Sequence, residues 1–159
     1  MATVTRMEEL SMTQEFFLVS PSNSTLAIQA GATAGDGVTL QPLDEASGLQ
    51  RWKIAMQFGG GYLGVAFINV QTQNSVTYNG NFAQLVMQSY SPNSTDRDSW
   101  LIFDTGTQSA CRIVDPADTS FSWNDLGGSV QPGDSIGLWN DTNANSMWTV
   151  MLPTNANLE

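Results

Sequence analysis

The sequence contains no histidine, and its only cysteine is Cys111. Histidine is the usual general base near neutral pH and the commonest metal ligand, so Ser-His and Cys-His catalytic pairs are excluded. A lone cysteine cannot form an intrachain disulfide. We therefore expect no catalytic residues, no metal site and no cofactor, and interpret Cys111 as a small buried hydrophobic residue.

Basic residues are also scarce. Five Lys and Arg stand against fifteen Asp and Glu, which gives a formal net charge of −10. Nucleic-acid binding depends on basic side chains that neutralise phosphates, and an anionic membrane surface repels a chain of this charge. The composition therefore predicts no nucleic-acid partner and favours a neutral or cationic one.

Long apolar runs are missing as well. No segment approaches the length of a membrane span, and the first 17 residues contain Glu8, Glu9 and Glu15 without the apolar stretch of a secretory signal. We expect a protein that is cytoplasmic, or secreted without a signal peptide.

What the chain does contain is typical of an all-β protein. It has 159 residues, the size of one domain, with 41% hydrophobic and 13% charged residues. The charged fraction is below the roughly 25% of an average protein. No segment has the pattern of a long helix, and polar residues such as Asn, Ser and Gly separate short apolar runs.

Three tryptophans reveal an internal repeat. Trp52, Trp100 and Trp148 are spaced 48 positions apart, and each begins a short alternating run typical of a strand. Before each Trp comes a glycine turn followed by an apolar pair that ends in Leu. We align these turns as Gly35–Leu40, Gly80–Leu85 and Gly133–Leu138.

Two earlier strand-like elements complete each unit. The first set is Phe17–Val19, Phe67–Val70 and Arg112–Val114, and the second set is Thr25–Ile28, Ser75–Tyr78 and Ser120–Trp123. Four strands in the same order three times predict repeats at about 14–60, 61–108 and 109–153, after a short N-terminal arm. We expect flexible junctions between the repeats at Gly59-Gly60-Gly61 and at Asp104–Ser109. Closure into a capped barrel hides the strand edges. A β-sandwich would not need the repeat, and a propeller needs more blades. We therefore predict a single β-trefoil domain over residues 1–159.

The third repeat resembles the ricin B-type lectin repeat, whose consensus is G-N-x-V-Q-L-W followed by N-Q-x-W. The matching residues are Gly133–Asn140 and Asn145–Trp148, and the first repeat keeps Q-x-W as Gln50-Arg51-Trp52. The other two repeats depart at the Gln, with Asp98 and Ser146 in its place. The resemblance spans nearly the whole chain after residue 15.

This resemblance implies one shallow sugar site per repeat. In the family, an Asp on the second strand accepts hydrogen bonds from sugar hydroxyls. An aromatic residue after the third strand stacks on the sugar, and an Asn near Q-x-W adds a contact. The Asp position falls on Ala27, Thr77 and Ser122, the aromatic position on Gln41, Val86 and Trp139, and the Asn position on Leu49, Arg97 and Asn145. Only the third repeat keeps the aromatic residue and the Asn.

We therefore place a candidate carbohydrate site in the third repeat. Its members are Ser122, Asn124, Asp125, Trp139, Asn140 and Asn145. The competing interpretation makes Trp139 a rim residue that covers the barrel and the polar residues ordinary turn formers. The weaker alternatives are Gln41, Asp44 and Gln50 in the first repeat and Tyr90 in the second.

The leading hypothesis is a non-enzymatic lectin for galactose- or N-acetylgalactosamine-type ends of glycoproteins or glycolipids. A homodimer would add avidity to shallow sites. The first alternative is a trefoil protease inhibitor that acts through loops such as Gly59–Gly64 or Asn124–Gly133. The second is a toxin-accessory subunit that binds no sugar, because every repeat lacks the second-strand Asp. Acidic residues are plentiful, but no pair has a spacing that recommends glycoside hydrolysis.

Overall fold

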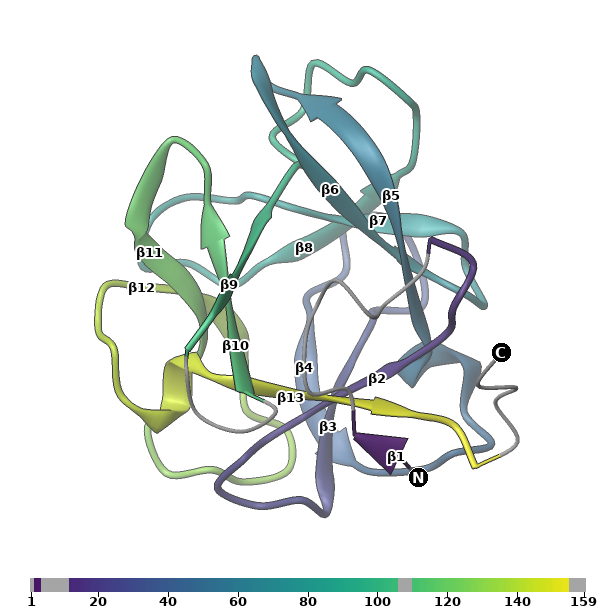
Figure 1. Cartoon of the computed structure of the whole chain (residues 1–159), viewed down its shortest axis with the longest axis vertical. Coiled ribbons are helices and arrows are strands. Elements are labelled where there is room, and N and C mark those ends of the chain that lie inside the picture. The colour runs from purple at the N-terminus through teal and green to yellow at the C-terminus, as the bar shows by residue number, and fades with distance from the viewer. Residues whose placement is uncertain (1, 4–11, 106–109, 155–159) are drawn as a thin grey trace.

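The computed structural model describes residues 2–3, 12–105 and 110–154. Each repeat supplies four strands, as predicted (Figure 1). The first repeat forms β2 (Phe17–Val19), β3 (Leu26–Gln29), β4 (Thr39–Pro42) and β5 (Trp52–Gly59). The second forms β6 (Tyr62–Asn69), β7 (Asn74–Thr77), β8 (Val86–Ser89) and β9 (Leu101–Asp104). The third forms β10 (Ala110–Asp115), β11 (Asp118–Asp125), β12 (Ile136–Trp139) and β13 (Trp148–Leu152).

The first and last strands of the repeats close into a barrel. Ladders join β5 to β6, β9 to β10 and β13 to β2, so each repeat pairs with the next. Within each repeat the first strand region meets the fourth, through Phe16↔Trp52, Val65↔Trp100 and Cys111↔Trp148. The ring of six strands therefore leaves no gap between repeats, as closure of the edges requires.

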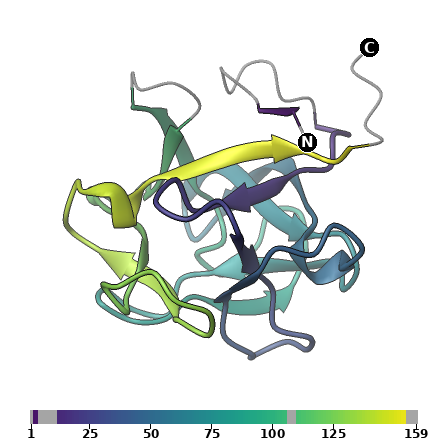
Figure 2. The same cartoon turned by 90° about the horizontal axis from the view of Figure 1, so that it is seen from below.

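The middle strands form three hairpins that cap one end of this barrel. The hairpins are β3–β4, β7–β8 and β11–β12, and Figure 2 shows this layer below β13 and β2. Their backbones meet in a cycle of hydrogen bonds in which the Val38 amide donates to Leu85, Leu85 to Ile136, and Ile136 to Val38, at 2.9, 2.9 and 3.0 Å. All three side chains are fully buried. This cycle lies at the pseudo-threefold axis and defines a β-trefoil.

The three tryptophans that revealed the repeat form its core. Trp52, Trp100 and Trp148 are at most 1% exposed. Each indole Nε1 donates to a backbone carbonyl of the second strand in its own repeat, namely that of Ile28 at 3.2 Å, Val76 at 3.0 Å and Trp123 at 3.0 Å. Each ring therefore joins the barrel to the cap. The three tryptophans are structural residues.

The junctions between repeats differ from the expectation of flexible linkers. Gly59-Gly60-Gly61 lies in the tight turn of the β5–β6 hairpin, where Gly60 and Gly61 have φ values of 59° and 90°. These left-handed conformations favour glycine. The second junction, predicted over Asp104–Ser109, lies partly outside the described residues. In the predicted N-terminal arm, β1 (Ala2–Thr3) pairs with β13 and adds a strand that the sequence did not suggest.

Candidate functional site

The cap hairpins place one residue of each repeat in the position of the family's stacking aromatic. The ladders pair Ala27 with Gln41, Ser75 with Gln88, and Ser122 with Trp139. The third repeat therefore has an indole where the other two have glutamines. Trp139 is 41% exposed at the end of β12, so its ring offers an apolar surface to solvent.

These pairs also correct the alignment of the second repeat. Gln88, not Val86, is the counterpart of Trp139, and Ser75, not Thr77, is the counterpart of Ser122. The cycle of hydrogen bonds fixes this register, because Leu85 occupies the place of Val38 and Ile136. The loops before and after the third strand differ in length between repeats, and the match of Gly80-Asn81 to the Gly-Asp of the other repeats misplaced the turn.

Phe82 is the residue that the sequence analysis missed. In the corrected alignment it takes the place of Gly35 and Gly133, and its φ of 60° lies in the same left-handed region as their 93° and 89°. Its ring contacts Trp139 across the repeat boundary, with centroids 4.9 Å apart and an interplanar angle of 82°. The Phe82 ring also contacts Phe121 at 5.0 Å. We call Phe82, Phe121 and Trp139 the aromatic cluster.

Exposure within the aromatic cluster is graded. Phe121 is 7% exposed and belongs to the core, whereas Phe82 is 50% exposed. The edge-to-face geometry of the two contacts is one that aromatic pairs prefer. Phe121 therefore anchors Phe82, and the outer surfaces of Phe82 and Trp139 stay open to a ligand.

Ser122 lies directly opposite Trp139 but is fully buried. Its Oγ accepts a hydrogen bond at 3.3 Å from Nη2 of Arg112, which comes from the neighbouring strand β10. This contact satisfies the hydroxyl within the protein. Ser122 therefore contributes to the frame beneath the indole and presents no free group on the surface.

Asn124 is buried as well, and its amide joins β11 to the loop that follows Trp139. Its Nδ2 donates to Ser146 Oγ at 2.8 Å and to Asp141 Oδ1 at 3.4 Å, while Ser146 Oγ donates to the same Asp141 oxygen at 2.6 Å. The position two before Trp148 thus fastens the loop, as Gln50 does in the first repeat through Gln29. The residue at the Gln position of Q-x-W therefore joins the second strand to this loop in both repeats.

Asp125 ends β11 and faces a second carboxylate, that of Asp134. The backbone between them contains Gly127, where a Cβ atom would lie 2.5 Å from Asp134 Cγ, so only glycine permits this approach. Burial, and then the hydrogen bond and charge of Asp134, raise the pKa of Asp125 to about 6. The hydrogen bond from the Gly127 amide stabilises the carboxylate and lowers this pKa in part. The Leu126 amide donates to the Ser135 carbonyl at 3.0 Å and closes the loop that the two carboxylates flank.

The two remaining candidates differ in exposure. Asn145 is half-buried, and its Nδ2 donates to the Gly128 carbonyl at 2.9 Å, which holds the 140–146 loop against the 126–134 loop. Asn140 is exposed next to Trp139. The structure therefore brings all six predicted residues into one region, with Trp139 and Asn140 on its surface and the other four beneath or beside them.

At the position of Trp139 the other two repeats have Gln41 and Gln88, so neither has a ring there. In the first, Gln50 is 1% exposed, and its amide donates to Gln29 and to the Pro42 carbonyl. In the second, Arg97 lies over the Tyr78 ring at 3.7 Å and pairs with Asp115 at 2.5 Å. These side chains are occupied within the fold, which leaves the third repeat as the exposed aromatic site.

Reactive groups are few in the described part of the chain. It holds no group of three Asp, Glu, His or Cys side chains arranged to bind a metal ion. Cys111 is 3% exposed, and burial and the charge of Asp104 raise its pKa to about 12. Such a thiol does not ionise near neutral pH, so it cannot act as a nucleophile. Among the described helices, none is long and apolar enough to cross a membrane.

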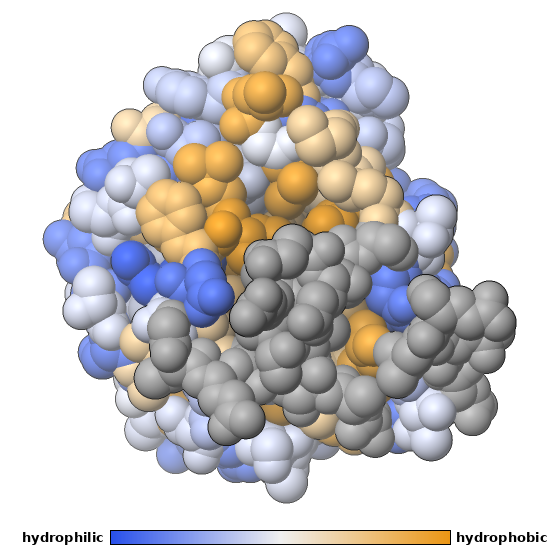
Figure 3. All heavy atoms as spheres, in the orientation of Figure 1, coloured by the Kyte–Doolittle hydropathy of each residue, from blue (hydrophilic) through white to orange (hydrophobic). Residues whose placement is uncertain are grey.

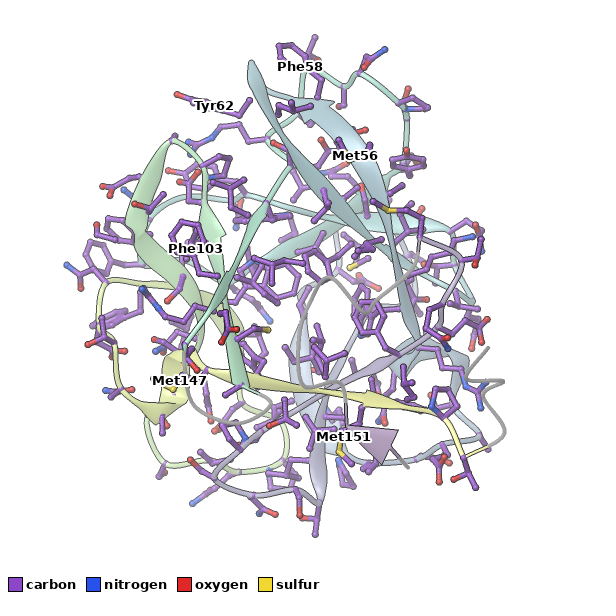
Figure 4. All side chains as sticks on the ribbon, in the orientation of Figure 1. Met56, Phe58, Tyr62, Phe103, Met147 and Met151 are labelled. Carbon is purple, nitrogen blue, oxygen red and sulfur yellow. The ribbon has the colours of Figure 1, made fainter. Side chains whose placement is uncertain are left out.

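A second exposed apolar surface lies on the β5–β6 hairpin. Met56, Phe58 and Leu63 are 61%, 49% and 63% exposed. Tyr62 on the same hairpin and Phe103 on β9 are 38% and 40% exposed (Figure 4). Figure 3 shows apolar side chains across this face of the molecule, from the hairpin toward β9. The hairpin is a tight turn, not the long loop that insertion into a protease cleft requires. In the other proposed inhibitory loop, Asn124–Gly133, the Gly128 carbonyl accepts a hydrogen bond from Asn145.

Solved structures share this architecture. A ricin B-like lectin from Macrolepiota procera, solved with lactose, has a TM-score of 0.72 and 19% identity over 91% of this chain and 99% of that chain. The C-half of an earthworm R-type lectin, solved with GalNAc, has a TM-score of 0.67 and 13% identity over 87% and 98%. A mosquitocidal holotoxin has a TM-score of 0.74 and 13% identity over 92% of this chain but 18% of its own.

These likenesses establish the fold that the sequence predicted. At such identities they do not carry a function from one protein to another. No protein-family model matches the sequence, and a search among curated proteins gives no match. A function for this chain must therefore be inferred from its own residues.

Proposed function

We propose that this protein is a carbohydrate-binding lectin whose sugar site lies in the third repeat around Trp139. The observation that carries the proposal is the exposed indole, 41% open to solvent, at a position that holds half-buried glutamines in the other repeats. A neutral sugar has C–H patches that bury against such a ring and hydroxyls that need hydrogen-bond partners. The scarcity of basic residues agrees with a neutral ligand.

Within this site the residues divide by role. Trp139 stacks on the sugar, and Asn140 offers an amide donor and a carbonyl acceptor to its hydroxyls. Ser122, Asn124, Asp125 and Asn145 hold the strand and the two loops that position the indole, through the contacts given above. A site built on a strand end and braced from beneath keeps the ring fixed before the ligand arrives, which lowers the entropy cost of binding.

The proposed ligands are galactose- or N-acetylgalactosamine-type ends of glycoproteins or glycolipids. The lactose complex of the Macrolepiota procera lectin and the GalNAc complex of the earthworm lectin support this class. The chain binds without reacting, and it acts without a metal or cofactor. A homodimer stays a prediction, which sedimentation velocity tests.

A glycan array with and without a calcium chelator tests the proposal. We expect binding to galactose- or GalNAc-terminated glycans that the chelator leaves unchanged. The Trp139→Ala variant should lose this binding. Gln41→Ala changes the equivalent position of the first repeat and serves as the matched control, because it should bind like the wild type. An array without any bound glycan would refute the proposal.

One observation favours a second candidate. The likeness to the mosquitocidal holotoxin covers 18% of that longer chain, so a trefoil of this shape also occurs as one part of a toxin. In that role the protein would bind a toxin subunit. Pull-down of one specific protein that free sugars do not displace would support this role over the lectin.

A further inference from the structure

Phe82 has a backbone conformation that its side chain disfavours. Its φ of 60° lies in the left-handed region, where the other two repeats have glycine. For a residue with a Cβ atom this conformation is strained. Strain of this kind persists where surrounding structure enforces it, and it concentrates at binding sites.

The fold itself does not need this ring. Gly35 and Gly133 form the same turn without a side chain, and both repeats keep the hydrogen bonds of the cap. The ring of Phe82 is half exposed, so the core gains only part of its apolar surface. The burial of half a ring therefore does not by itself explain why a strained residue stands at this position.

The position of the ring suggests what balances this strain. Phe82 and Trp139 come from different repeats, and their rings are nearly perpendicular with centroids 4.9 Å apart. Aromatic side chains bury about 150–250 Å² each, so each half-exposed ring offers on the order of 100 Å². One sugar ring stacked on Trp139 leaves the surface of Phe82 open to the next unit of a chain.

We propose that Phe82 is a second stacking residue, and that the site spans the boundary between the second and third repeats and takes a glycan of at least two sugar units. This inference rests on the proposed lectin function. The two rings at 82° fit a glycan that bends at its glycosidic bond and presents C–H faces in two directions. Asn81 and Asn140, both exposed, are the sequence neighbours of the two rings and supply hydrogen-bonding groups for the sugar hydroxyls. The Asn81 oxygen accepts a hydrogen bond from the Tyr78 hydroxyl at 3.2 Å, so its amide nitrogen is the group it offers.

Calorimetric titration with paired sugars tests this assignment. The probes are galactose with lactose, and N-acetylgalactosamine with the disaccharide GalNAcα1-3Gal. We expect the wild type to bind the disaccharide of the recognised pair about five- to tenfold more tightly than its monosaccharide. Phe82→Gly and Phe82→Asn both suit a left-handed position and remove the ring. In both variants disaccharide affinity should fall to the monosaccharide level, while monosaccharide affinity stays unchanged.

Two control variants separate the ring from other effects. Phe58→Ala removes an equally exposed phenyl ring, 49% open, from the β5–β6 hairpin. Gln73→Gly relieves another left-handed residue, with φ of 61°, outside the aromatic cluster. Both should bind like the wild type.

The outcomes that overturn the inference are distinct from those that overturn the lectin proposal. A wild type that binds sugars with no preference for the disaccharide, or Phe82 variants that keep that preference, overturn the inference and leave the lectin intact. Equal losses of monosaccharide and disaccharide affinity also overturn it, because they indicate a damaged Trp139 site. A wild type that binds no sugar on the array overturns both.

Discussion

Replacing each repeat tryptophan by phenylalanine should destabilise the protein by a similar amount at all three positions. Each change removes an indole Nε1–H that is hydrogen-bonded to a buried carbonyl at 3.0–3.2 Å. A buried carbonyl left without a partner costs about 1–3 kcal/mol. The smaller ring leaves a void of roughly 40 Å³, which at about 24 cal/mol per Å³ adds about 1 kcal/mol.

The expected loss is therefore about 2–4 kcal/mol for each of Trp52→Phe, Trp100→Phe and Trp148→Phe. Urea unfolding followed by circular dichroism measures it, with the slope m checked for constancy between variants. Since the three environments are equivalent, the three values should agree within about 1 kcal/mol. For a domain of this size the melting temperature should fall by roughly 5–12 °C.

Trp139→Phe is the matched control, because it is the same substitution at an exposed position. It should change the free energy of unfolding by no more than about 0.5 kcal/mol. A core variant as stable as this control would refute the claim that each indole ties the barrel to its cap. A spread of several kcal/mol among the three would refute their equivalence.

Three further predictions concern titration, thiol reactivity and the buried tie. The raised pKa of Asp125, about 6 against 3.8 when unfolded, means that the folded state binds more protons between these values. The free energy of unfolding should therefore fall as pH rises from about 4 to 6, by on the order of 1 kcal/mol after solvent screening, and Asp125→Asn should remove this slope. Cys111 should resist a thiol reagent in the native protein at pH 8 and react with one equivalent in urea; rapid native labelling would contradict its burial. Asn124→Ala should cost about 1–3 kcal/mol, because it removes the hydrogen bonds from the Asn124 amide to Ser146 and Asp141, and an unchanged melting temperature would contradict that role.

The sequence was sufficient to predict the threefold architecture. Large apolar residues that must fill equivalent places in a symmetric core recur at constant spacing, so Trp52, Trp100 and Trp148 revealed both the repeat and its last strand. Trp123 and Phe121, which alternate with small residues in the strand-like run Ser120–Trp123, also face the core, at 0% and 7% exposure. The spacing of core residues is visible in the sequence because the equivalent residues of every repeat pack in the same way.

The glycine turn of the second repeat could not be found in this way. Gly80-Asn81 imitates the Gly-Asp of the other repeats, yet the left-handed position falls two residues later on Phe82. Loop lengths vary freely at the surface, whereas the hydrogen bonds of the cap fix the register, and only the structure shows these bonds. The contact between Phe82 and Trp139 crosses a repeat boundary, so no pattern within one repeat could indicate it.

The sequence predicted residues that lie together in the fold, but it did not predict which of them face solvent. All six of its residues lie in one region, because they flank the same two strands and loops of the third repeat. Polar residue types alone do not show which side chains face solvent. Ser122, Asn124 and Asp125 are each at most 3% exposed, and their hydrogen-bonding groups serve the fold.

The most direct test of the third-repeat site follows the five tryptophan indole signals in a ¹H–¹⁵N correlation spectrum during titration with a glycan that binds on the array. Comparison with Trp139→Phe identifies the Trp139 signal. If this ring stacks on the sugar, its Nε1–H signal should shift with ligand concentration, while those of the buried Trp52, Trp100 and Trp148 stay in place. A glycan that binds while the Trp139 signal does not move would contradict the account.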